Sequence, residues 1–163
     1  MRLRYIARMG KPYKLVLYGA TGFTGRLCAH YLSTVPDLQG QQWAIAGRTE
    51  HKLQALASEL QHPLGLDVLT VPLTDAAATD ALVKSADAII NCAGPFSQCH
   101  GEQLLGSCAR NGVHYSDLSG ESWWQASMAD KFHDAATSSG AKIVFGGGVD
   151  SITLVQPKAT RSR

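Results

Sequence analysis

Residues 15–25 read LVLYGATGFTG, a short apolar run that leads directly into a glycine-rich turn. The run at residues 15–18 has the length of a buried strand. After the turn, Leu27, Tyr31 and Val35 follow at helical spacing. This order, strand then glycine turn then helix, is typical of the first unit of an open α/β sheet.

The glycines of this turn stand at positions 19, 22 and 25, and each suits a phosphate-binding loop. The first permits a sharp turn, the second lets an anion approach the backbone, and the third brings the helix close to the strand. The helix start then offers unpaired N–H groups to phosphate. The residues predicted to bind a dinucleotide here are Gly19, Ala20, Thr21, Gly22, Phe23, Thr24 and Gly25. A Walker A loop is excluded because no Lys-Ser/Thr pair follows the glycines. A ligand-free glycine turn is the alternative.

The rest of the chain repeats the alternation of strand and helix. Apolar runs predict five further strands at residues 43–46, 68–73, 88–92, 113–118 and 142–145. Helical patterns predict the intervening helices at residues 53–60, 75–84, 104–111 and 124–139, the last with Met128 and Phe132 inward. Six strands that alternate with helices indicate an α/β protein, a doubly wound parallel sheet in three α/β/α layers, the Rossmann fold.

The end of the second predicted strand indicates which dinucleotide is bound. NAD-binding domains place an acid here to hold the ribose hydroxyls, whereas this sequence has Arg48. An arginine can pair with a 2′-phosphate, and Thr49 can add a hydroxyl, with Lys52 one turn further on. The predicted cofactor is therefore NADP(H). In the alternative, Arg48 is a solvated charge beside Glu50.

Two later segments lie at the same predicted edge of the sheet. Asp75 follows the third strand and is expected either to approach the adenine or to cap the next helix. Ala93, Gly94 and Pro95 follow the fourth strand, which flanks the point where the strand order reverses. These small residues are predicted to lie beside the nicotinamide half of the cofactor, the alternative being a plain turn.

The sequence identifies no catalytic residue. His100 and five other polar residues fall near strand ends, but they form no catalytic constellation; the five are Ser97, Tyr115, Asp117, Glu121 and Asp150. Both the Tyr-x-x-x-Lys pair and the GxSxG elbow are absent. We expect structural roles for His100, Asp117 and Glu121, and packing roles for Trp123 and Trp124.

Composition restricts the classes of function. The 163 residues are 45% hydrophobic and 17% charged, as in a globular domain, and the net charge is +2. The basic residues are scattered, which argues against a nucleic-acid partner, and no apolar run approaches the roughly 20 residues of a membrane span. The four cysteines lack metal-ligand spacing, so we predict no metal site and free thiols in a reducing compartment.

The domain boundaries are predicted from the two ends. Residues 1–12 carry arginines before any acid and are interpreted as a basic N-terminal extension, with a mitochondrial presequence as the alternative. The NAD(P)-binding domain is predicted over residues 13–152. Residues 153–163 are expected to form a disordered tail.

Five segments, in this order, resemble one known family, the saccharopine dehydrogenase-like oxidoreductases, which include the bacterial trans-acting enoyl reductases. The matching segments are residues 15–25, 43–48, 91–96, 114–121 and 149–152. The resemblance spans residues 13 to 152. It implies an N-terminal NADP-binding domain, followed in the family by a mixed α/β domain that supplies much of the substrate pocket.

The resemblance also implies hydride transfer to an unidentified small-molecule substrate, for which a lipid-linked molecule is one candidate. We expect an intracellular, cytoplasmic protein, and the resemblance leaves association with a membrane surface, lipid droplets or mitochondria open. A homo-oligomer also stays open. Because the sequence stops soon after residue 152, we expect a truncated chain whose second domain is missing. Whether the chain is an enzyme therefore stays open. The alternatives are a non-catalytic NADP(H)-sensing module and an inactive fragment that acts through protein contacts.

Overall fold

The computed structural model describes residues 11–60 and 62–148. Six strands form one sheet in the order β3-β2-β1-β4-β5-β6, and all neighbouring pairs are parallel. The strands are β1 (Tyr13–Tyr18), β2 (Trp43–Gly47), β3 (Asp67–Thr70), β4 (Ala86–Asn91), β5 (His114–Asp117) and β6 (Ile143–Val144). The order reverses between β1 and β4, which confirms the predicted doubly wound Rossmann sheet.

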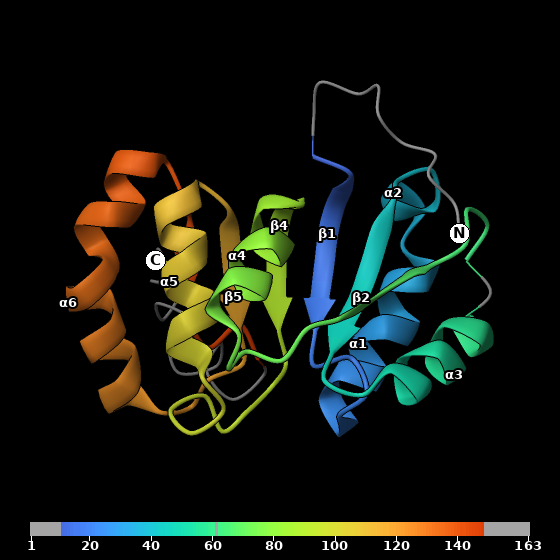
Figure 1. Cartoon of the computed structure of the whole chain (residues 1–163), viewed down its shortest axis with the longest axis horizontal. Helices are drawn as coiled ribbons and strands as arrows, with labels where there is room; N and C mark the ends of the chain where they lie inside the picture. The colour runs from blue at the N-terminus through green and yellow to red at the C-terminus, as the bar shows by residue number, and fades with distance from the viewer. Residues whose placement is uncertain (1–10, 61, 149–163) are drawn as a thin grey trace, which may run out of the picture.

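Helices cover both faces of this sheet (Figure 1). The helices are α1 (Phe23–Thr34), α2 (Pro36–Gln39), α3 (Glu50–Leu60), α4 (Ala76–Lys84), α5 (Gly101–Asn111) and α6 (Ser122–Ser139). One face packs against α1 and α3, and the other against α4, α5 and α6. The single turn α2 was not predicted, because four residues are too few to show a helical period.

Alternate residues of the central strands enter two separate cores. Val16 and Ile89 point toward α4–α6 and join Leu104, Leu105 and Met128. On the opposite face, Leu17, Trp43, Ile45, Leu53 and Leu56 form the core beneath α1 and α3. Successive strand residues face opposite sides, so a strand covered on both faces must be apolar throughout. The predicted inward positions of Met128 and Phe132 are confirmed.

Small residues set the packing of α1. Gly25 and Ala29 are its buried residues, and a Cβ atom on Gly25 would lie only 2.1 Å from the Gly19 carbonyl oxygen. Three large apolar residues of the helix face outward instead: Phe23 is 87%, Leu27 58% and Tyr31 70% exposed, whereas Leu32 packs against the core. The apolar spacing that indicates this helix therefore marks its solvent side.

Caps and breaks explain where several elements begin and end. The Asp75 side chain accepts a hydrogen bond from the Ala78 amide at 2.9 Å and starts α4, and Gly112 ends α5 with φ 66°. Strand β3 stops at Thr70, earlier than the predicted residue 73, because Pro72 has no N–H group to donate to a neighbouring strand.

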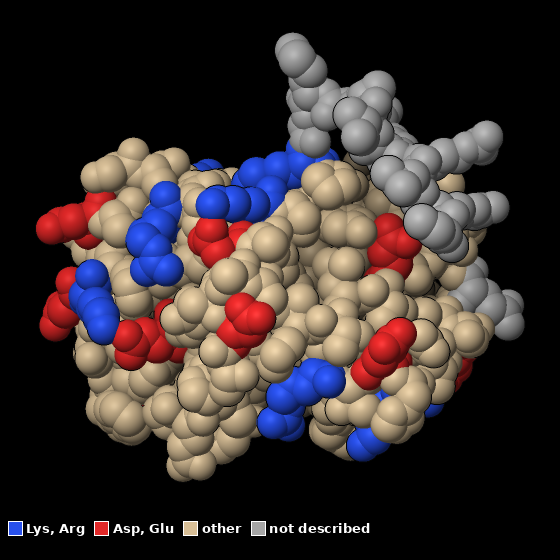
Figure 2. All heavy atoms as spheres, viewed as in Figure 1, with Lys and Arg blue, Asp and Glu red and all other residues tan. Residues whose placement is uncertain are grey.

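The surface shows no concentration of one sign of charge on the face seen in Figure 2, where basic and acidic residues alternate. Among the described residues, no helix is both long enough and apolar enough to span a bilayer. The predicted tail at residues 153–163, and the predicted extension apart from residues 11 and 12, lie outside the described ranges.

Candidate functional site

The carboxyl ends of the strands meet at the lower edge of the sheet in Figure 1, and a cavity of about 400 Å³ opens there. Loops after β1, β2, β3 and β4 form its walls. The predicted site residues that line it are Gly19, Thr21, Gly22, Arg48, Thr49, Ala93 and Gly94. Three segments far apart in the sequence thus converge on one cavity, at the edge where ligands of open α/β sheets bind.

The glycine turn is joined to both neighbouring strands. The Gly19 amide donates to the Ala46 carbonyl at 2.9 Å, and the Cys92 amide donates to the Tyr18 carbonyl at 2.8 Å. Gly19 has φ 77°, and a Cβ atom there would lie 2.7 Å from the Ala93 nitrogen. A side chain at position 19 would therefore push β1 and β4 apart at the cavity floor.

The start of α1 is open toward the cavity. Its N-cap residue, Gly22, provides no side chain that could accept a hydrogen bond, and the first turn contains no acidic residue. The first amides of a helix lack partners within the helix, and the helix dipole makes this end positive. An anion is the ligand that this end favours.

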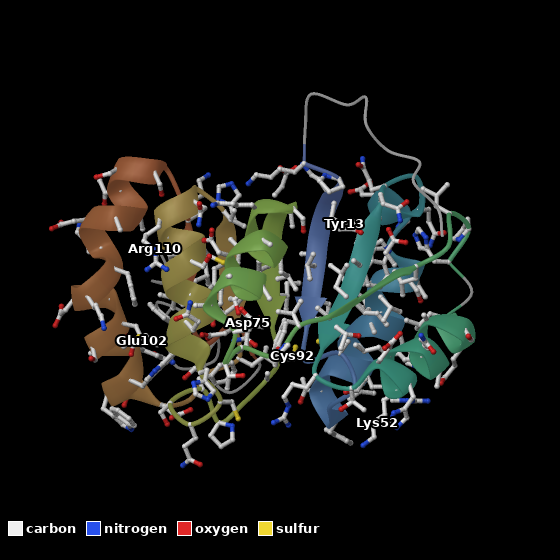
Figure 3. All side chains as sticks on the ribbon, viewed as in Figure 1. Tyr13, Lys52, Asp75, Cys92, Glu102 and Arg110 are labelled. Atoms are coloured by element: carbon white, nitrogen blue, oxygen red, sulfur yellow. The ribbon has the colours of Figure 1, made fainter. Side chains whose placement is uncertain are left out.

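Cations line the wall that follows β2. Arg48 is exposed and, within residues 11–60 and 62–148, forms no salt bridge at 4.0 Å or less. The neighbouring Glu50 accepts a hydrogen bond from Gln54 at 2.9 Å. Lys52 lines the same wall, and Figure 3 shows it near the start of α3 at this edge of the molecule. The wall therefore has two positive charges available for an anionic group.

Tyr18 lies between the cationic wall and the end of β3. Its hydroxyl donates to the Val71 carbonyl at 2.7 Å. Burial raises the pKa of Tyr18 to about 12, against the opposing effect of the Arg48 guanidinium. Tyr18 therefore keeps its proton at neutral pH and serves as a wall of the cavity.

Backbone and thiol groups line the wall that follows β4. The Ala93 amide donates to the Asn91 side-chain oxygen at 3.0 Å, which fixes the first residue of the turn. Cys92 lies at the end of the strand (Figure 3), and burial together with Cys28 raises its pKa to about 12. The sulfur atoms of Cys28 and Cys92 are 3.9 Å apart, and all four cysteines are free thiols.

Six predicted site residues lie outside the cavity lining. Ala20 and Gly25 are buried beneath the glycine turn, and the side chains of Phe23 and Thr24 project to solvent from the first turn of α1. Asp75 caps α4, as one of its two predicted roles required. Pro95 lies just beyond the lining residue Gly94.

Other lining residues were not among the predicted site residues. These are Tyr18, Gly47, Lys52, Pro72, Leu73, Thr74, Cys92, Gln98, Cys99 and His100. Several end a strand or follow one, so their position at the carboxyl edge was the available signal. Gln98, Cys99 and His100 line the cavity because of the path that the loop after β4 takes, and the sequence alone does not give that path. His100 holds a left-handed conformation there, with φ 58°.

The polar residues near the end of β5 form a buried network. The Tyr115 hydroxyl donates to Asp117 Oδ2 at 3.0 Å and accepts from Asn91 Nδ2 at 3.1 Å. Burial raises the pKa values of both Tyr115 and Asp117. Both side chains are closed to solvent, and their contacts match the structural role expected for Asp117. Asp150 lies outside the described ranges.

Comparison with known proteins assigns this domain to a family. A family model described as the saccharopine dehydrogenase NADP binding domain matches residues 15–144. The chain belongs to this family. The resemblance to this family is thereby confirmed, with four of the five segments inside the matched residues, and so is NADP(H) as the cofactor of the domain.

Relatives of the family agree over most of the chain. The human saccharopine dehydrogenase-like oxidoreductase is 31% identical over an alignment of 153 residues, and the match covers 87% of this chain and 35% of the human protein. A Caenorhabditis elegans protein named lipid droplet localized protein is 32% identical over an alignment of 145 residues, and the match covers 86% of this chain and 34% of that protein. The chain thus spans about a third of the length of these relatives.

A solved structure shows the same fold. Apo saccharopine dehydrogenase (L-Glu forming) from Saccharomyces cerevisiae superposes with a TM-score of 0.69 at 19% identity. The match covers 85% of this chain and 28% of the yeast chain. The cavity described above fits the cofactor of the family, because it combines an open helix N-terminus, a glycine at position 19 that leaves no room for a Cβ atom, and two cations.

Proposed function

We propose that this chain is the cofactor-holding domain of an NADP(H)-dependent oxidoreductase. The observation that carries the proposal is the convergence of the glycine turn, the Arg48 wall and the β4 turn on one cavity. When bound, the nicotinamide supplies hydride transfer. The substrate is a small molecule, and the name of the Caenorhabditis elegans relative supports a lipid-linked one.

Each wall has a distinct task in this proposal. The first turn of α1 and residues 19–22 bind the pyrophosphate through backbone amides. Arg48 and Lys52 pair with the 2′-phosphate, and Thr49 adds a hydroxyl beside them. Ala93 and Gly94 offer backbone without bulk to the nicotinamide half, and Pro95 follows them.

A second candidate function is an NADP(H)-sensing module without chemistry. Two cavity side chains that could move a proton, those of Tyr18 and Cys92, have pKa values raised to about 12 and stay protonated at neutral pH. An efficient general acid or base has a pKa near the working pH. Neither Tyr18 nor Cys92 therefore suits proton transfer at neutral pH, which favours binding without turnover. His100 and Cys99 in the same lining are the side chains through which turnover would have to proceed.

We also propose that the protein acts at a lipid surface and that a further domain completes the substrate pocket. The printed name of the Caenorhabditis elegans relative supports the first, and the length of the relatives supports the second. A homo-oligomer stays a prediction.

Calorimetric titration with NADPH and NADH, side by side, tests the cofactor assignment. We expect NADPH to bind at least about tenfold more tightly, because only NADPH carries the group that Arg48 and Lys52 can pair with. Equal affinities would contradict the assignment of the cationic wall. Absence of binding by a folded sample would refute the proposed function as a whole.

A further inference from the structure

The turn that follows β4, residues 93–97, is held by a side chain from a distant element. The Phe96 amide donates to Glu121 Oε1 at 2.7 Å, and the Ser97 amide donates to Glu121 Oε2 at 3.4 Å. We propose that Glu121 is a positioning residue for the cofactor site, which holds this turn where the nicotinamide half of NADP(H) binds. This inference rests on the proposed function.

Glu121 is itself fixed to the sheet. Its amide donates to the Ser119 hydroxyl oxygen at 3.2 Å, and the Ser119 amide donates to Asp117 Oδ1 at 3.0 Å. Asp117 ends β5 and is completely buried. A continuous series of hydrogen bonds therefore runs from the core strand β5 to the β4 turn.

The same network holds the other end of the turn. Asn91 accepts from the Ala93 amide at 3.0 Å, and its amide group donates to the Tyr115 hydroxyl, which is bonded to Asp117. Hydrogen bonds thus connect both residue 93 and residues 96–97 to β5. Gly94 lies between these two anchors and lines the cavity. The position of the turn depends on both anchors, and Glu121 provides the second one.

The role of Glu121 differs from that of an ordinary helix cap. It is the N-cap residue of α6, yet its side chain accepts no hydrogen bond from the amides of that helix. Its carboxylate is directed to the β4 turn instead. Hydrogen bonds from Ser97 and from the Phe96 amide lower the pKa of Glu121, so the acceptor is ionised at neutral pH and binds these donors as a charged group.

The test compares NADPH with adenosine 2′,5′-bisphosphate, which carries the 2′-phosphate but no nicotinamide. The variants are Glu121→Ala, Glu121→Asp, which keeps the charge but shortens the reach, and Glu121→Gln, which keeps one acceptor oxygen. We expect Ala and Asp to weaken NADPH binding at least about tenfold and to change bisphosphate binding less than about twofold. The Gln variant should recover part of the NADPH affinity.

Asp87→Asn is the matched control, because this exposed carboxylate pairs with Lys14 near the amino ends of β1 and β4, at the opposite edge of the sheet from the β4 turn. Circular dichroism of each variant establishes that it is folded. Unchanged NADPH affinity in the Ala and Asp variants, or an equal loss for both ligands, would overturn the positioning role. If the Ala variant does not fold, the Asp and Gln variants decide. Failure of the unmodified chain to bind either ligand would instead remove the proposed function on which the inference rests.

Discussion

Replacing Arg48 with alanine tests the cofactor specificity of the domain most directly. Arg48 lines the cavity and forms no salt bridge within residues 11–60 and 62–148, so its removal breaks no ion pair in that part of the structure. We therefore expect the thermal midpoint to stay the same and the effect to fall on ligand binding. The affinity for NADH, which has no 2′-phosphate, should change less than about twofold.

The magnitude follows from the surroundings of Arg48. A hydrogen bond to a charged group contributes about 1.5–3 kcal/mol, and the exposure of Arg48 places this contact in the lower half of that range. Lys52 remains in the same wall and keeps part of the attraction. NADPH should therefore bind about 10–30-fold more weakly, since each 1.4 kcal/mol corresponds to a factor of about ten.

Calorimetry on both dinucleotides measures this loss. Lys14→Ala is a suitable control, because Lys14 pairs with Asp87 near the amino ends of β1 and β4, away from the cavity. Arg48→Asp should lower NADPH affinity further, since an acid at this position repels the 2′-phosphate. If Arg48→Ala binds NADPH as tightly as the unmodified chain does, the assignment of the 2′-phosphate to this wall is wrong.

Two further predictions concern α4. Asp75→Ala removes the cap bond to Ala78 and should lower the free energy of unfolding by about 1 kcal/mol, with NADPH affinity unchanged; a clear loss of affinity in calorimetry would instead favour the adenine role. Hydrogen bonds from Lys84 and Ser107 lower the pKa of Asp80 to about 2. Its folded-state pKa lies below the unfolded value, so Asp80 stabilises fully above about pH 4 and loses this effect as the pH falls toward 2. Urea unfolding should show Asp80→Asn less stable by about 1 kcal/mol at pH 7, with a difference that shrinks in acid; a constant difference would contradict this view of the carboxylate.

Local chemistry made the fold and the floor of the site predictable. The glycine turn needs its residues at fixed offsets within one strand–turn–helix unit, so residues 19–25 carry the signal by themselves. Arg48 could be identified because its position relative to β2 follows from the strand pattern alone. The Asp75 cap acts over three residues and was equally visible.

Features that depend on distant contacts were not predictable from the sequence. Glu121 lies 25 positions from Phe96, and nothing near either residue indicates their hydrogen bond. The buried side of α1 could not be predicted for a different reason. Gly25 lies there because it allows close approach to the backbone, and a pattern of large apolar side chains does not include glycine.

The central pairing of the sheet has a consequence for how the chain folds. Strand β1 pairs with β4, and the Lys14–Asp87 bond at this junction joins residues 73 positions apart. Contacts of such long sequence separation form slowly, because the entropy of closing the intervening chain is lost before the contacts stabilise it. The cofactor cavity lies on this junction, so during synthesis it cannot form until Asn91 and the turn after it have been made. NADP(H) then binds only chains that have completed the slow pairing, and by mass action a hundredfold excess over Kd adds about 2.7 kcal/mol to the native state.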